Sequence, residues 1–257
     1  MPISLLVFLT VLVLLLLSMP LYALLGARRD ADAARKGTQF AGGAGNFLVH
    51  WFMWLLGPAE RLVLKSGASP DVFNFAGLFC GLVAGLCIGA GRLDLGGWAI
   101  ALGGVCDIFD GRIARARGLS SRYGQFIDST LDRFVEVFAL LGFVYYLGRL
   151  PGGALVAAAA LAGSLLVSYA RARGESVGVL CKEGLMQRAE RLVLTCLVAL
   201  SDGFVSARFG LVPGTPSFWV LALIAVGTFG TATQRTYWIA RRLRRDAAPE
   251  VNSGAAV

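Results

Sequence analysis

Apolar stretches long enough to cross a bilayer recur along the whole sequence. A hydrocarbon core about 30 Å thick requires about 20 helical residues. Seven stretches reach that length, at residues 3–26, 70–91, 96–117, 122–148, 152–174, 189–210 and 215–242. With 56% hydrophobic residues, the chain is also far too apolar for an ordinary soluble domain. The sequence therefore predicts an all-α, polytopic membrane protein.

The chain divides into three predicted parts. We expect residues 1–45 to form an N-terminal transmembrane anchor and linker, 46–245 to form the main domain, and 246–257 to form a disordered tail. The first span has no basic region before it, and its positive charges follow it. We therefore interpret it as an anchor rather than a cleaved signal peptide, with removal by processing as the alternative.

Residues 46–65 differ from the spans because apolar and charged side chains are mixed in them. This mixture predicts an amphipathic helix in the membrane interface, with Trp51 and Trp54 at headgroup depth. A helix buried under a loop is the alternative. The single histidine, His50, lies in the same stretch, where we expect it to pack or to contact headgroups. General-base chemistry would then fall to a carboxylate.

Basic residues are distributed unevenly over the two predicted membrane sides. When the segment after the first span is placed in the cytoplasm, only three of the 24 basic residues fall on the opposite side: Arg92, Arg149 and Arg208. By the positive-inside rule, we expect the N-terminus to be outside and the C-terminus to be inside. We also expect the protein to lie in the inner (cytoplasmic) membrane, with the active site facing the cytoplasm. The net charge of +8 then indicates orientation and attraction to anionic lipids and phosphorylated substrates, not nucleic acid.

Four aspartates lie within two of the apolar spans. Asp107 and Asp110 share one face of the first helix, and Asp128 and Asp132 share one face of the next. An ionised carboxylate in a bilayer is costly, so its presence indicates function. A short polar turn joins the two spans, so the two faces can point at each other. The alternative is that the aspartates only pair with nearby arginines: Arg112, Arg115, Arg122 and Arg133.

Carboxylates this close together need a cation. Two like charges about 4 Å apart repel by about 4 kcal/mol at an effective dielectric of 20. Carboxylate oxygens suit hard cations such as Mg²⁺, Mn²⁺ or Ca²⁺, and four carboxylates are enough for two ions that clamp a phosphate. Gly111 and Gly124 would let a bulky ligand approach the backbone. Arg115 can pair with phosphate oxygens.

The spacing from Asp107 to Asp132, D-x2-D-G-x2-A-R-x8-G-x3-D-x3-D, resembles the signature of the CDP-alcohol phosphotransferases at all eight fixed positions. The resemblance covers residues 50–245 and implies a six-helix core, to which the first span and the interfacial helix are additions. It further implies a CDP-diacylglycerol substrate, release of CMP, two Mg²⁺ or Mn²⁺ ions per active site and a homodimer. Asp107, Asp110 and Asp128 would be metal ligands, and Asp132 would be both ligand and proton acceptor.

The same resemblance assigns residues to the CDP-lipid. Asp71 and Asn74 fall in the family's element at the start of the first core span, with Asn74 at the position of the usual threonine. Ser69 and Pro70 in the same element have an alternative, purely structural explanation, as the N-cap residue and the first-turn proline of a helix. The remaining positions assigned to the CDP group are Gly111, Arg115, Ser121 and Gly124.

Further residues bear on the alcohol that accepts the lipid phosphate. Three segments resemble elements of prokaryotic phosphatidylinositol-phosphate synthases: Ser168–Gly178, Gln187–Leu192 and Thr231–Arg235. In that branch a basic cluster binds the phosphate of inositol phosphate, and the matching residues here are Arg171, Arg191 and Arg235. Three guanidinium groups converging on one phosphate are chemically suitable. The alternative is that these arginines only mark the inner membrane face.

The residues and the resemblance together predict a membrane phospholipid synthase that transfers a phosphatidyl group from CDP-diacylglycerol to inositol phosphate. Glycerol 3-phosphate and free inositol are alternative acceptors for the same chemistry. A divalent-cation transporter is an alternative of another class, and it would need polar side chains across the whole membrane. A catalytically silent lipid- or nucleotide-binding module is a third alternative, against which the intact aspartate set argues.

Overall fold

The computed structural model describes residues 3–25, 43–181 and 183–246, and every regular element within them is an α-helix. The helices are α1 (Ile3–Leu24), α3 (Gly43–Ser66), α4 (Pro70–Gly89), α5 (Leu93–Ala116), α6 (Arg122–Leu147), α7 (Gly153–Ser176), α8 (Arg188–Phe209) and α9 (Thr215–Asp246). The predicted all-α fold is therefore confirmed. Most of the predicted linker and nearly all of the predicted tail lie outside the described residues.

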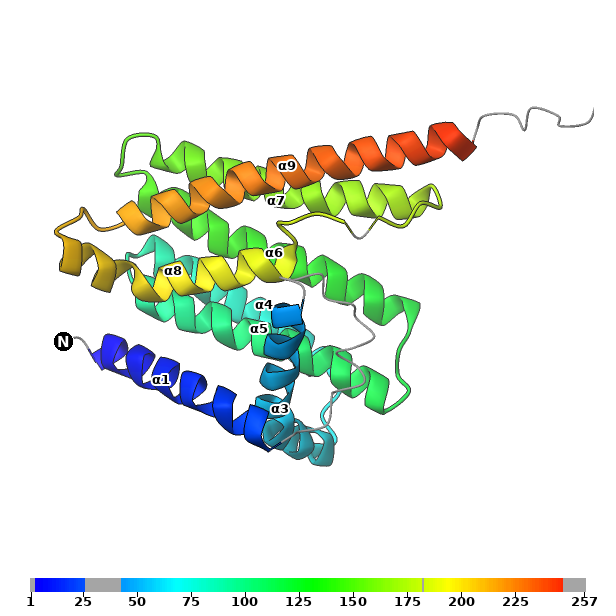
Figure 1. Cartoon of the computed structure of the whole chain (residues 1–257), viewed down its shortest axis with the longest axis horizontal. Coiled ribbons are helices and arrows are strands. Elements are labelled where there is room, and N and C mark those ends of the chain that lie inside the picture. The colour runs from blue at the N-terminus through cyan, green and yellow to red at the C-terminus, as the bar shows by residue number, and fades with distance from the viewer. Residues whose placement is uncertain (1–2, 26–42, 182, 247–257) are drawn as a thin grey trace, which may run out of the picture.

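Each predicted span coincides with a helix to within about one turn at either end. Within the described residues, six helices are long and apolar enough to cross a membrane: α1, α3, α4, α7, α8 and α9. The aspartates and arginines of α5 and α6 lower the apolar content of these two helices. In Figure 1, α5 and α6 nevertheless run beside α4 and α8, whereas α3 lies across the direction of the other helices. The membrane-spanning role of α5 and α6 and the interfacial position of α3 stay predictions.

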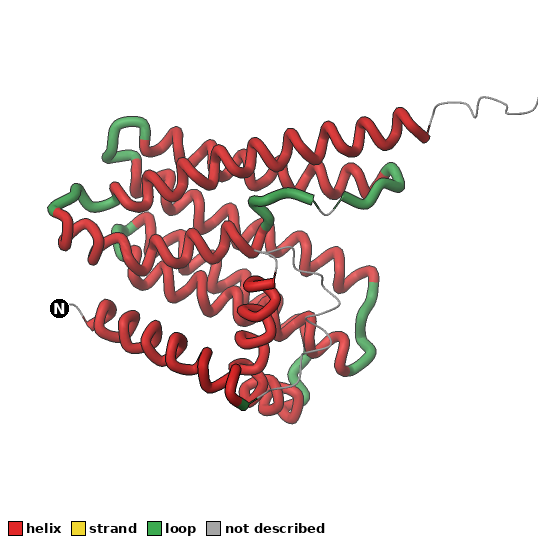
Figure 2. The backbone as a smooth tube through the Cα atoms, in the orientation of Figure 1, coloured by secondary structure: helices red, strands yellow, loops and turns green. Residues whose placement is uncertain are grey.

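Helices α4 to α9 form an antiparallel bundle with two distinct ends (Figures 1 and 2). The α5–α6 turn, the α7–α8 segment and the C-terminal end of α9 lie at one end, on the right of Figure 1. We call it the motif end because it holds the aspartates. The α4–α5, α6–α7 and α8–α9 turns lie at the opposite, far end with the start of α1. Of the segments that the charge distribution assigned to one side, these three lie together, whereas the basic segment after α1 lies outside the described residues.

Glycines bring the backbones of α4 and α6 into contact. A Cβ atom on Gly85 would collide with the carbonyl oxygen of Phe138, and one on Gly142 would collide with that of Gly85. Lipid tails are as apolar as leucine, so helices in a bilayer associate largely through such close packing of small residues. Because α4 packs on both α5 and α6, this contact helps to position the two helices that carry the aspartates.

The far half of the bundle is filled with apolar side chains contributed by α4 to α9. Its fully buried members include Ile88, Phe143, Leu147, Leu221 and Ile224. Apart from Asp202 and the groups bonded to it, the tight apolar packing offers few partners to water or ions in this half. Within the described residues, the bundle thus lacks the continuous polar path that the transporter alternative requires.

One carboxylate in this half has a structural role. Asp202 of α8 is 1% exposed and accepts hydrogen bonds from the backbone N–H groups of Gly214 and Ser217, each at 2.9 Å. It also accepts one from the Ser217 hydroxyl at 2.6 Å. These donors belong to the start of α9, so Asp202 satisfies groups that a helix N-terminus leaves unpaired.

Helix α1 is joined to α3 through aromatic side chains. Trp51 donates from Nε1 to the hydroxyl of Ser18 at 2.8 Å, and Tyr22 packs against Phe47 and Trp54. Trp51 is only 6% exposed. Its indole therefore serves to attach α1, which differs from the headgroup-facing position expected for it.

We expect Asp202→Ala to lower the free energy of unfolding by about 3 kcal/mol, because the three buried donors at the start of α9 lose their acceptor at once. Thermal unfolding in detergent measures this loss. Asp94→Ala is the matched control, since Asp94 makes only a peripheral ion pair with Arg92 at 3.6 Å and should change stability by less than about 1 kcal/mol. Equal losses in the two variants would contradict the capping role.

Candidate functional site

Three of the four aspartates converge at the motif end. Carboxylate oxygens of Asp107, Asp110 and Asp128 all lie within 4.8 Å of one another. The first two come from the C-terminal part of α5, and Asp128 comes from the N-terminal part of α6. Asp110 is only 5% exposed, so its charge is largely withdrawn from water. The predicted meeting of two aspartate faces is confirmed for these three residues.

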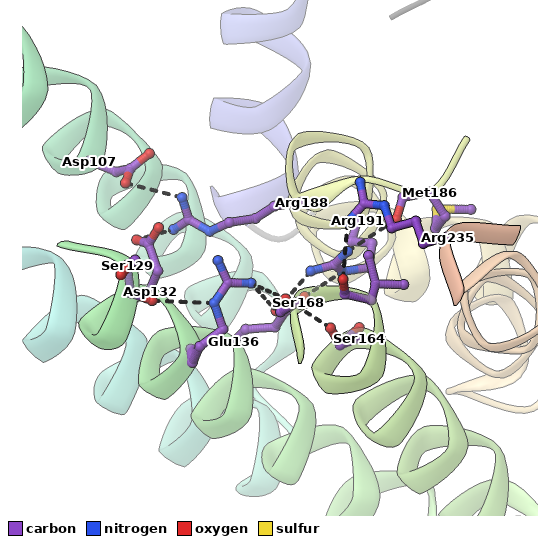
Figure 3. A network of polar contacts seen from close by, with 12 residues as sticks. Asp107, Ser129, Asp132, Glu136, Ser164, Ser168, Met186, Arg188, Arg191 and Arg235 are labelled. Carbon is purple, nitrogen blue, oxygen red and sulfur yellow. Dashed lines mark hydrogen bonds and ion pairs between the residues drawn. The ribbon is translucent and has the colours of Figure 1, made fainter. Parts of the chain in front are cut away.

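The fourth aspartate, Asp132, lies beside this group and faces α8. Arg188 donates from NH2 to Asp132 Oδ1 at 2.5 Å and from NH1 to Asp107 Oδ1 at 3.1 Å. Figure 3 shows the guanidinium group of Arg188 reaching between the two carboxylates. The structure thus gives Asp132 an arginine partner from another helix, and its role as a metal ligand stays a prediction.

Deeper along α6, Glu136 binds Arg191 through both carboxylate oxygens. The Nε–Oε1 distance is 2.5 Å and the NH2–Oε2 distance is 3.0 Å. Arg133 lies 3.7 Å from Glu136 Oε2 and also donates to the hydroxyl of Ser168 on α7. Glu136, Arg191 and Asp132 line a cavity of about 30 Å³. This is about the volume that one molecule occupies in liquid water. A buried ion pair with such partners holds the inner wall of the site in one arrangement.

The segment between α7 and α8 returns into the bundle before α8 begins (Figure 1). Arg235 of α9 donates to the carbonyl oxygens of Glu183 at 2.7 Å and Val167 at 3.0 Å. The hydroxyl of Thr231 accepts a hydrogen bond from the backbone N–H of Met186 at 3.1 Å. These contacts fix the returning segment, so the first turn of α8 lies at the depth of the α6 carboxylates.

The three arginines predicted to bind the acceptor phosphate lie in one region but differ in their surroundings. Arg235 is close enough to Arg171 and Arg191 for their like charges to interact. Arg191 and Arg235 are 2% and 3% exposed, whereas Arg171 is exposed and pairs with Glu175 at 2.9 Å. Of the three, Arg171 is the one that faces outward, and the other two are held by carboxylate or carbonyl oxygens.

Two pairs of residues predicted to contact the CDP group lie around the α5–α6 turn. Ser121 caps α6, because its Oγ accepts a hydrogen bond from the N–H of Gly124 at 3.0 Å. A Cβ atom on Gly111 would lie 3.1 Å from NH1 of Arg115. The glycine at position 111 thus leaves room for this guanidinium group on the aspartate-bearing face.

The other predicted CDP contacts begin α4 at the same end. Asp71 is exposed in the first turn, and Asn74 is buried one turn later. Arg117, which follows α5, donates to the carbonyl oxygens of Leu64 at 2.9 Å and Ala68 at 2.6 Å. This link ties the start of α4 to the end of α5, so both elements border the same site.

Arg188 and Glu136 are site residues that the sequence did not single out. Glu136 continues the four-residue spacing of Asp128 and Asp132, which places it on the same face of α6. Arg188 lies in the Gln187–Leu192 segment. The sequence therefore contained a weak indication that each residue belongs to the site. Of the nearby arginines, Arg112 lies 2.7 Å from Glu60 on α3, and Arg133 pairs with Glu136. Asp107 and Asp132 pair with Arg188, an arginine distant in sequence that the alternative of local aspartate–arginine pairing did not include.

The donor set fits a hard divalent cation. Three clustered carboxylates offer only oxygen ligands, the type that Mg²⁺ and Mn²⁺ prefer. The guanidinium groups of Arg188 and Arg191 lie on the α8 side. Such a site can hold a cation at the carboxylates and anionic oxygens near the arginines, which is the arrangement that phosphoryl chemistry requires.

The sequence matches the family model of the CDP-alcohol phosphatidyltransferases over residues 68–229. It is 36% identical over 200 residues to the phosphatidylinositol phosphate synthase of Streptomyces avermitilis, a match that covers 74% of this chain and 80% of the relative. It is 32% identical over 188 residues to the archaetidylinositol phosphate synthase of Methanothermobacter thermautotrophicus, covering 72% of this chain and 88% of the relative.

The fold is similar to crystal structures of the phosphatidylinositol phosphate synthase of Mycobacterium tuberculosis. One, with CDP-DAG bound, has a TM-score of 0.64 at 25% identity and covers 78% of this chain and 98% of that chain. Another, in complex with manganese and citrate, has the same TM-score and identity and covers 77% of this chain and 92% of that chain. The aspartates that could hold a metal ion thus lie in a fold with a manganese-bound relative.

We expect Asp110→Asn to weaken Mn²⁺ binding by about 100-fold, because a neutral amide replaces one of three clustered carboxylates. The electron paramagnetic resonance signal of free Mn²⁺ measures the affinity in detergent-solubilised protein. Asp246→Asn is the control, since Asp246 lies exposed at the end of α9 and pairs with Arg242 at 3.3 Å. Unchanged affinity in Asp110→Asn would contradict the assignment of the metal site.

Proposed function

The chain belongs to the CDP-alcohol phosphatidyltransferase family, and we propose that it transfers a phosphatidyl group from CDP-diacylglycerol to a hydroxyl of inositol phosphate. The observation that carries this proposal is the carboxylate group of Asp107, Asp110 and Asp128 beside the α8 arginines at one end of a membrane bundle. The synthases of Streptomyces and Mycobacterium, whose names specify phosphatidylinositol phosphate, support the choice of acceptor.

Asp107, Asp110 and Asp128 are the residues that would hold the metal. We propose two ions, Mg²⁺ or Mn²⁺, with Asp132 completing the ligand set, as the family resemblance implies. When bound, the ions neutralise the diphosphate and polarise the oxygens around the reacting phosphorus. The CDP group would lie along Gly111, Arg115, Ser121 and Gly124, with Asp71 and Asn74 on the opposite side.

Asp132 is the proposed proton acceptor. Its carboxylate takes the proton of the acceptor hydroxyl, and that oxygen forms a bond to the phosphorus next to the diacylglycerol. The bond from this phosphorus to the bridging oxygen breaks, and CMP leaves with the electron pair. Asp132 later returns the proton to water. The protein contributes mainly by aligning the two substrates and by balancing their charge.

The acceptor phosphate would be bound by Arg171, Arg191 and Arg235. Arg171 is the exposed member and can exchange Glu175 for a phosphate without leaving a buried charge. Arg191 and Arg235 are already fixed by their protein partners, so they add positive charge with little loss of side-chain entropy. A phosphorylated acceptor gains more from this basic region than an uncharged polyol does.

The protein is proposed to lie in the inner membrane with its motif end facing the cytoplasm. The asymmetry of basic residues supports this orientation, and a water-soluble phosphorylated acceptor needs an aqueous route to the site. A homodimer is proposed on the family resemblance.

A panel of acceptors tests the proposed reaction. With CDP-diacylglycerol and Mg²⁺ in detergent, inositol phosphate should release CMP at least about tenfold faster than free inositol, because only the former uses the basic region. The measurement is CMP formation, followed by chromatography. Product from glycerol 3-phosphate with none from inositol phosphate would make the acceptor wrong while keeping the chemistry.

Asp132→Asn should lower kcat by about 100-fold or more, because the amide cannot accept the proton. Binding of CDP-diacylglycerol, measured by calorimetry in micelles, should change by less than about threefold. Asp94→Asn, at the far end, is the control and should retain full activity. Unchanged turnover in Asp132→Asn would contradict its assignment as the base.

A further inference from the structure

We propose that a groove between α4 and α6, at the far end of the bundle, binds an anionic phospholipid of the leaflet opposite the aspartates. One acyl chain lies in the groove, and the phosphate contacts Arg92 and Arg149. The site is separate from the proposed catalytic function, because the turns that carry these two arginines lie at the other end of the bundle from the aspartates (Figure 1).

The groove has a volume of about 420 Å³. Glycines form its floor where the backbones of α4 and α6 touch, and larger apolar side chains stand beside them: Gly85, Gly89, Gly142, Leu82, Leu86 and Tyr145. Apart from the Tyr145 hydroxyl, the lining side chains are apolar. The groove therefore suits a hydrocarbon chain and offers few partners to a polar ligand.

The length of the groove matches one leaflet of a bilayer. Leu82 and Ala90 mark its two ends on α4, and a helix rises about 12 Å over the residues between them. One leaflet contributes about 15 Å to the hydrocarbon core. A chain that enters beside Ala90, at the far end, can thus stay in the groove over most of the depth of its own leaflet.

A helix from a second copy of the chain fits this groove less well. Glycines four residues apart, as on α4, often receive a partner helix. Here that partner is α6 of the same chain, because a Cβ atom on Gly81 would collide with Val135 and one on Gly85 would collide with the carbonyl oxygen of Phe138. The glycine face is already occupied, and the remaining space favours something narrower than a helix.

Two arginines lie at the end of the groove where Ala90 is found. Arg92 follows α4 in the α4–α5 turn, and Arg149 follows α6. A Cβ atom on Gly91 would lie 4.0 Å from NH2 of Arg149, so this guanidinium group reaches the α4–α5 turn. Arg149 donates from Nε to the carbonyl oxygen of Tyr146 at 2.9 Å. Its two terminal nitrogens form no other hydrogen bond within the described residues and can bind a phosphate.

The charge at this end calls for an anionic partner. Arg92 and Arg149 are two of the three basic residues that the charge distribution leaves on the far side, where basic residues are disfavoured. Arg92 is 3.6 Å from Asp94, and their side chains are 62% and 30% exposed. Such an exposed pair contributes little and can open. The two arginines and this carboxylate leave one positive charge in excess, which complements a lipid phosphate.

The test uses two lipids with identical dioleoyl chains, phosphatidylglycerol and phosphatidylcholine, added to delipidated protein in detergent. Native mass spectrometry measures how much lipid is bound, and thermal unfolding measures the shift in Tm. The variants are the double substitution Arg92→Gln/Arg149→Gln and the groove-filling Ala90→Phe. Arg208→Gln is the matched control, because Arg208 is the third far-side basic residue and stacks on Phe209 of α8 instead. These measurements need no turnover.

We expect the unaltered protein to bind phosphatidylglycerol about tenfold more tightly than phosphatidylcholine, with a rise in Tm of about 5 °C at saturation. The double variant should lose this preference, because it keeps the groove but not the charges. Ala90→Phe should weaken binding of both lipids by at least about fivefold, since the ring occupies the space of the chain. Arg208→Gln should behave like the unaltered protein.

An undiminished preference for phosphatidylglycerol in the double variant would overturn the proposal, and so would an equal loss in Arg208→Gln. Unchanged lipid binding in Ala90→Phe would place the chain elsewhere. If light scattering also showed a dimer becoming a monomer in that variant, the groove would belong to a second copy.

A labelling experiment on the unaltered protein decides the matter if the double variant does not fold. Phosphatidylglycerol with a photoreactive group at the end of one acyl chain should label peptides of α4 and α6. An excess of unlabelled phosphatidylglycerol should suppress this labelling far more than the same excess of phosphatidylcholine. Equal suppression by the two lipids would show that the arginines select no headgroup.

Discussion

The structure depends on balancing negative charge inside an apolar bundle. Helices α5 and α6 carry the carboxylates, and α8 carries the guanidinium groups that face them, Arg188 and Arg191. A carboxylate withdrawn from water without a partner would be strongly destabilising. The pairing of α8 with both α5 and α6 therefore supports the fold and, at the same time, defines the walls of the site.

The depth at which α8 begins follows from the path of the segment before it. This segment turns back into the bundle, where α9 binds its backbone through Thr231 and Arg235. Had α8 begun level with the end of α7, its first arginines would lie in the aqueous layer, away from Asp132 and Glu136. The same contacts explain why Arg235 is buried although it lies on the predicted binding face.

Local patterns in the sequence predicted the helices and the aspartate group well. Hydrophobic length located the spans, and helical spacing placed Asp107, Asp110 and Asp128 where they meet. The partner of Asp107 and Asp132 could not be found in this way, because Arg188 is 81 and 56 residues distant from them. Asp202 was isolated in the sequence, and its capping role became visible only when Ser217 was brought beside it. Family resemblance located Arg191, but only the folded structure shows that Glu136 of α6 holds it.

The apolar packing of the far half has a consequence for the membrane itself. An enzyme of the proposed kind, which would bind divalent cations and take up protons at one surface, is a potential leak across an energised bilayer. Each charge that crossed would dissipate about 2.3 kcal/mol per 100 mV of membrane potential. With Ile88, Phe143 and Leu221 sealing the opposite side, catalysis can proceed at one leaflet while the transmembrane gradient remains intact.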